Sequence, residues 1–130
     1  MLIITNNPLV TEKYPDIVNY IDCDIKTVFN KVRDMIHKEA KLVSYPLSGS
    51  LKPHENPFKS IIVTTNNGKA DFKSLQIIED SLVILERYSR DNFIEFSKCS
   101  SFGKYDKNEN LFNDYAVIDL DLVSSAFMQM

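Results

Sequence analysis

Four short apolar runs alternate with segments of helical periodicity, and this alternation constrains the fold more than any other feature of the chain. The runs cover residues 2–5, 16–22, 41–45 and 59–65, and apolar runs of this length beside turn residues are typical of strands. Strands that alternate with helices predict a three-layer α/β domain. The connection between the third and fourth runs has no helical pattern. We therefore expect a mostly parallel sheet that can be mixed, with about four to five strands.

Helix boundaries can be predicted from residue types that favour the first turn. Asn7 followed by Pro8 suits an N-cap and a first helical residue, which predicts a short helix to about residue 14. Asp24 is placed to cap a second helix, and Ser74 a third that continues to about residue 98. The second helix has a clear apolar stripe: Ile25, Val28, Phe29, Val32 and Ile36.

The C-terminal third is predicted from composition and alternation. Residues 100–113 are polar and rich in turn formers, which predicts a surface loop. "YAVIDLDLV" at 115–123 begins with an apolar run, which predicts that the segment starts as a strand and can end in a short C-terminal helix.

Size and charge narrow the class of protein. A chain of 130 residues suits a single domain, 1–130. Its net charge of −3 argues against nucleic-acid binding, which needs clustered Lys and Arg. No run has the length of a membrane span and the N-terminus lacks a signal-peptide pattern. We expect a cytoplasmic protein without membrane contact, in which Cys23 and Cys99 are reduced thiols and Cys23 is buried and inert.

The segment "PLSGSLKPHENPF" at 46–58 is the strongest candidate for a site. It leaves the third predicted strand at its carboxyl end, as "TNNP" leaves the first, and ligands of open α/β sheets bind outside those ends. Gly49 permits a tight turn or a close backbone approach. Because Gly, Pro and Ser are also ordinary loop formers, a structural loop and a functional loop are equally compatible with the pattern.

Both segments carry groups that could bind an anion. The candidate ligand-binding residues are Asn6, Asn7, Ser48, Gly49, Ser50, Lys52 and Lys59. His54 and Glu55 form a titratable pair and are the candidate catalytic residues. "DLD" at 119–121 is weak evidence for a metal, so we predict no metal site. No motif identifies a cofactor.

The same two segments resemble a known family. "LIITNNPLV" at 2–10 and "PLSGSLKPHENPFKSI" at 46–61 are similar to the GrdX family, as are "VRDMIHKEAKL" at 32–42, "SLQIIEDSL" at 74–82 and "VIDLDL" at 117–122. Members are small proteins encoded with the glycine, sarcosine and betaine reductase systems of amino-acid-fermenting anaerobes. The resemblance implies an accessory role beside those reductases and assigns no activity, cofactor or catalytic residue.

Two functions are compatible with these observations. The first is a non-catalytic accessory module that binds a small anion, a nucleotide or a reductase subunit. The second is a small transferase or hydrolase that uses His54 or Glu55, with Lys52 and Lys59 holding an anionic substrate. The absence of an acid, base and nucleophile pattern in the sequence favours the first function.

Overall fold

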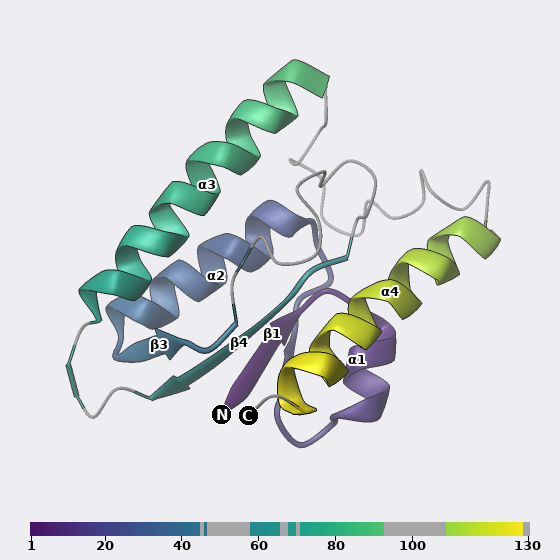
Figure 1. Ribbon diagram of the computed structural model, residues 1–130, viewed down its shortest axis with the longest axis horizontal. Coiled ribbons are helices and arrows are strands. Elements are labelled where there is room, and N and C mark those ends of the chain that lie inside the picture. The colour runs from purple at the N-terminus through teal and green to yellow at the C-terminus, as the bar shows by residue number, and fades with distance from the viewer. Residues whose placement is uncertain (45, 47–57, 66–67, 70, 93–108, 129–130) are drawn as a thin grey trace.

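The computed structural model describes residues 1–44, 46, 58–65, 68–69, 71–92 and 109–128. Its sheet contains β1 (Leu2–Thr5), β2 (Val18–Tyr20), β3 (Ala40–Leu42) and β4 (Ser60–Thr65) in the order β2-β1-β4-β3. β1 and β2 are parallel, whereas β4 is antiparallel to both β1 and β3. The structure therefore confirms an α/β fold with a mixed sheet (Figure 1).

Two pairs of helices cover the two faces of this sheet. The helices are α1 (Pro8–Lys13), α2 (Ile25–His37), α3 (Phe72–Asn92) and α4 (Glu109–Met128). α2 and α3 lie together on one face, and α4 lies beside α1 on the other (Figure 1). Alternating side chains of the strands divide between the two sides: Ile4 and Ile61 face α2 and α3, while Ile3 and Ile62 face α1 and α4.

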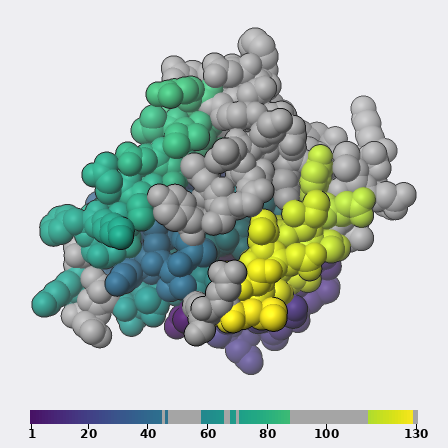
Figure 2. Space-filling model, in the orientation of Figure 1, coloured from purple at the N-terminus to yellow at the C-terminus, as the bar shows by residue number. Residues whose placement is uncertain are grey.

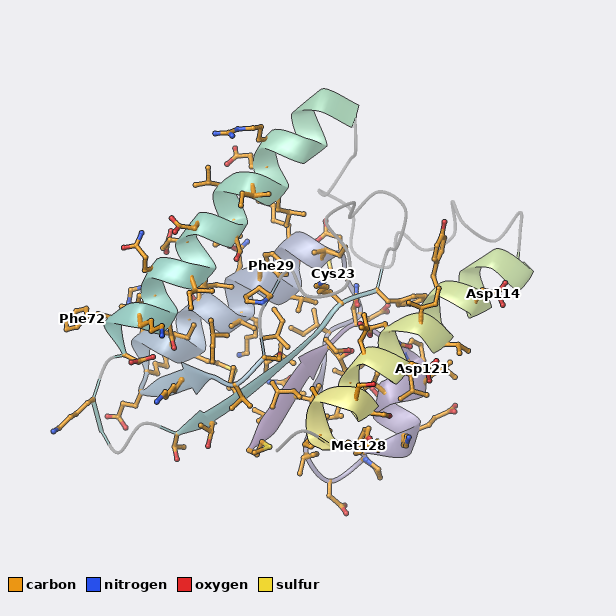
Figure 3. All side chains as sticks on the ribbon, viewed as in Figure 1. Cys23, Phe29, Phe72, Asp114, Asp121 and Met128 are labelled. Atoms are coloured by element: carbon orange, nitrogen blue, oxygen red, sulfur yellow. The ribbon has the colours of Figure 1, made fainter. Side chains whose placement is uncertain are left out.

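The core below α2 and α3 is a continuous apolar cluster. It contains the stripe predicted for the second helix, and Phe29 at its centre is fully buried. Figure 3 labels Phe29 on α2, between that helix and its neighbours. The opposite core is smaller and is built around Ile3, Val10, Ile62 and Val123.

Helix caps follow the sequence prediction in two cases of three. The Asn7 side chain accepts a hydrogen bond from the Leu9 amide, and the Asp24 side chain accepts one from the Thr27 amide. The second carboxylate oxygen of Asp24, Oδ2, is buried without a hydrogen-bond partner. The predicted cap at Ser74 was wrong, because α3 begins at Phe72 and the Asp71 side chain accepts from the amide and hydroxyl of Ser74. Ser74 lies inside the first turn, where its hydroxyl donates to Asp71 and accepts from the Leu42 amide.

The predicted strand at 115–123 was also wrong, because these residues lie within α4. The predicted surface loop at 100–113 was wrong in its last part for the same reason, since α4 begins at Glu109. Ala116, Asp119 and Val123 are buried while their neighbours on the opposite side of the helix are exposed. That spacing of three and four residues is helical. The alternating "DLDL" pattern hid it because α4 is apolar on its outer side as well.

Candidate functional site

Polar side chains gather at the carboxyl end of β1, where β4 begins. Because the two strands are antiparallel with Thr5 opposite Ser60, residues that follow β1 lie beside residues that start β4. α4 adds the carboxyl group of Asp119, which contacts Asn7 and Ser60. We call these residues the polar cluster: Thr5, Asn6, Asn7, Lys59, Ser60 and Asp119. All of them except Ser60 are buried, and Asp119 is only 4% exposed.

A chain of hydrogen bonds with a defined direction crosses the polar cluster. The Ser60 hydroxyl lies 2.7 Å from Asp119 Oδ2 and donates to that carboxylate. Ser60 Oγ therefore accepts from Thr5 Oγ1, at 2.6 Å, since each hydroxyl has a single proton to donate. Thr5 Oγ1 in turn accepts from the Asn7 amide, at 3.0 Å. These hydrogen bonds join β1, β4 and α4, and they run from the Asn7 amide at one end to the Asp119 carboxyl group at the other.

Asn7 joins three elements through one side chain. Its Oδ1 accepts from the Leu9 amide and so caps α1. Its Nδ2 donates to the Ala116 carbonyl at 2.8 Å and to Asp119 Oδ2 at 3.0 Å. Those two contacts use both hydrogens of the amide nitrogen. The side chain therefore fixes α4 against the start of α1, and neither amide hydrogen is left for a ligand.

Asn6 holds the start of β4 against the end of β1. Its Oδ1 accepts from the Lys59 amide at 2.8 Å, and its Nδ2 donates to the Cys23 carbonyl at 3.1 Å. The Asn6 amide also donates to the Lys59 carbonyl. Because Asn6 is fully buried, these bonds satisfy polar groups that would otherwise be costly to bury.

Asp119 and Lys59 bring opposite charges into this buried region. Burial raises the pKa of Asp119, while the hydrogen bonds from Ser60 and Asn7 and the nearby Lys59 act in the opposite direction. Burial likewise lowers the pKa of Lys59, and the charge of Asp119 opposes that change. Each group therefore stabilises the charged form of the other against desolvation.

The structure brings three of the predicted ligand-binding residues together: Asn6, Asn7 and Lys59. Ser48, Gly49, Ser50 and Lys52, and the candidate catalytic residues His54 and Glu55, lie outside the described residues. Phe58 and Lys59, which follow this segment in the sequence, are described, and the Lys59 amide donates to the Asn6 side chain. A site formed by this loop and the carboxyl end of β1 stays a prediction.

Asp119, Ser60 and Thr5 are cluster members that sequence reasoning missed. Asp119 was considered only as a weak metal ligand on a strand. Its helical spacing from Ala116 and Val123 was the available signal, since an acid among small apolar residues on one helix face is usually paired when buried. Among the residues that the structure describes, no three His, Cys, Asp or Glu side chains are grouped as metal ligands.

Cys23, which lies at the start of α2 (Figure 3), is disulfide-bonded. The prediction of a reduced and inert thiol was therefore wrong at this position. Flanking acids oppose formation of a thiolate. Whether a disulfide forms depends instead on which two sulfur atoms the fold brings together, and the sequence separation of two cysteines does not give their distance in space. Cys99, the other cysteine in the sequence, lies outside the described residues. Reduced cysteines therefore no longer support the expected cytoplasmic location, which stays a prediction.

A family model described as GrdX-like protein matches residues 2–128. The chain belongs to the GrdX-like family. This confirms the resemblance carried by the segments around Asn7 and Gly49. Searches of curated proteins and of solved structures found no match. No helix within the described part of this GrdX-like chain is long and apolar enough to cross a membrane.

Proposed function

We propose that this GrdX-like protein is a non-catalytic accessory protein that binds a component of the glycine, sarcosine or betaine reductase systems. The family membership supports the association with these systems. The observation that carries the non-catalytic part is the bonding of the polar cluster. Both amide hydrogens of Asn7 and the Ser60 hydroxyl are directed to groups of the chain itself. The cluster thus joins α4 to the sheet, and a substrate would have to displace those bonds.

The test is a binding titration of the purified protein with each purified component of a glycine reductase. We expect saturable binding to at least one component, and no turnover of substrate by the GrdX-like protein alone. A control titration with an unrelated acidic protein of similar size measures non-specific association. If none of the components binds, the proposed function is overturned.

A small-anion site is a second candidate, and the burial of Lys59 favours it. Lys59 is 7% exposed and lies two residues after the candidate segment 46–57, which contains Lys52. A desolvated ammonium group binds a phosphate more strongly than an exposed one does. In this proposal Lys59, Lys52 and the Ser48-Gly49-Ser50 segment hold the anion, and Asn6 holds the backbone of Lys59 in place. An enzyme using His54 or Glu55 would require the same site.

Calorimetric titration with phosphate, simple nucleotides and glycine tests the anion proposal. Lys52→Met should weaken binding by roughly ten- to a hundredfold, because a charge-assisted hydrogen bond is lost. Lys26→Met, on the exposed side of α2, is the matched control and should bind as the wild type does. His54→Ala should abolish turnover only if the protein is an enzyme. Absence of binding by the wild type contradicts the anion site for these ligands.

A further inference from the structure

α4 has two apolar sides, and within the part of the chain that the structure describes only one of them packs against other elements. Its inner side packs on the sheet and α1 through Val123, Leu120 and Phe127. Its outer side exposes Val117 to 40% and Ile118 to 49%. A helix that is apolar all round is normally buried on all sides. The outer side of α4 is therefore suited to contact with another molecule.

The exposed residues form one continuous surface, which we call the outer face of α4. At 3.6 residues per turn they share about 140° of the helix circumference. They are Asp114, Val117, Ile118, Asp121, Leu122, Ser125 and Met128. Asp114, Asp121 and Met128 are labelled along the helix in Figure 3, and Figure 2 shows α4 at the surface of the molecule. Single exposed apolar residues are ordinary on a protein surface, but a contiguous group on one helix marks an interaction site.

The charges on this face all have the same sign. Asp114 and Asp121 are seven residues apart, two helical turns, and run along the middle of the outer face with apolar residues on either side. Residues 109–128 contain no Lys or Arg. Within the described part of the chain, neither carboxylate has an ion pair. The face thus offers apolar contact area and two carboxylates to the same partner.

This charge pattern argues against a second copy of the chain as the partner. In a symmetric dimer the same face meets itself. An antiparallel pairing of two α4 helices centred near Ile118 would place Asp114 of one copy near Asp121 of the other, and a parallel pairing would place each Asp near its own equivalent. Both arrangements bring like charges together in a partly apolar interface, which is unfavourable.

We infer that the outer face of α4 is the docking surface for a protein partner whose apolar groove carries Lys or Arg opposite Asp114 and Asp121. The inference rests on the proposed function, since it names the face through which the reductase component binds. A helix laid into an apolar groove is a common recognition mode, and the paired charges fix its register.

The experiment compares four variants in the titration with purified glycine reductase components. Ile118→Lys and Asp121→Lys alter the outer face. Ile84→Lys and Asp80→Lys make the same changes on α3, where Ile84 is 42% exposed and Asp80 is also exposed. All four replace surface residues, and circular dichroism checks that each is folded. We expect Ile118→Lys and Asp121→Lys to weaken binding by about tenfold or more, and the α3 variants to bind as the wild type does.

Binding of the wild type should also weaken as the salt concentration is raised, because salt screens the attraction between the two Asp residues and a basic partner.

Each other outcome overturns the inference in a recognisable way. If the wild type binds and both α4 variants bind equally well, the docking surface is elsewhere while the proposed function stands. If no component binds the wild type, the proposed function fails together with the inference. If sedimentation shows a wild-type dimer that Ile118→Lys converts to a monomer, the occupant of the face is a second copy.

Discussion

Among the residues whose side chains the structure describes, α2 and α3 pack on one face of the sheet through an apolar cluster with eleven buried members, whereas the cluster on the other face has four. α4 is additionally joined to β1, β4 and α1 by hydrogen bonds of Asp119, Asn7 and Ser60. Apolar burial is strong but non-directional, while hydrogen bonds between buried groups require one geometry. We therefore expect the apolar contacts of α2 and α3 to contribute more to the free energy of unfolding than those of α1 and α4. The polar cluster sets the position of α4.

The largest effect is expected from the apolar side. Phe29→Ala should lower the free energy of unfolding by about 3–5 kcal/mol, because a fully buried ring is replaced by a cavity. Urea denaturation measures the change. Phe72→Ala is the matched control, since Phe72 is 79% exposed, and should cost less than about 0.5 kcal/mol. Similar losses for both variants would contradict the assignment of the main core to this side.

Breaking the hydrogen-bond chain should have the next largest effect. Ser60→Ala leaves the Thr5 hydroxyl without its acceptor and removes one donor from Asp119, so we expect a loss of about 1–3 kcal/mol. Hydrogen exchange should show that the amides of α4 lose more protection than those of α2. Ser125→Ala, on the exposed side of α4, should change neither quantity. Equal loss of protection in both helices would show that the cluster does not act on α4 in particular.

Asp119→Asn should have a smaller effect, visible mainly in the pH dependence. The amide oxygen can still accept from Ser60 and Asn7. Because burial raises the pKa of Asp119 above 3.8, the folded state binds this proton more tightly than the unfolded state does. The stability of the wild type relative to Asp119→Asn should therefore fall as pH rises from about 4 through the raised pKa. Urea denaturation of both proteins between about pH 4 and pH 8 measures the difference, and a difference that is flat or rises with pH contradicts the prediction.

The smallest effect is expected for the surface ion pair between the helices of the apolar side. Arg33 Nε lies 3.8 Å from Glu79 Oε1, and their side chains are 38% and 50% exposed. Solvent screening makes such a pair weak, so Arg33→Ala should change stability by less than about 1 kcal/mol. Thermal denaturation of the wild type and Arg33→Ala at low and high salt measures the change in stability. A loss comparable to that of Ser60→Ala would mean that polar contacts position α3 as they position α4.

Local signals allowed much of this structure to be predicted. Asn7 and Pro8 predicted the start of α1, Asp24 predicted the cap of α2, and the stripe containing Phe29 predicted the larger core. These features depend on residues three or four positions apart, so neighbouring residue types are sufficient. The predicted apolar runs contain β1, β2 and β4, whereas β3 begins one residue before the predicted run 41–45; β2 and β3 are shorter than predicted.

The sequence by itself therefore determined the α/β class and the first two helices. Only the tertiary structure decided that 115–123 is helical, that Asp71 rather than Ser74 caps α3, that Cys23 is disulfide-bonded and that Asp119 completes the polar cluster. The reason is physical. Asp119 is 112 residues from Asn7, and a carboxylate becomes a buried hydrogen-bond acceptor only when packing brings distant donors to it. The alternating sequence around Asp119 is compatible with a strand or a helix, and contact with β4 and α1 selects the helix.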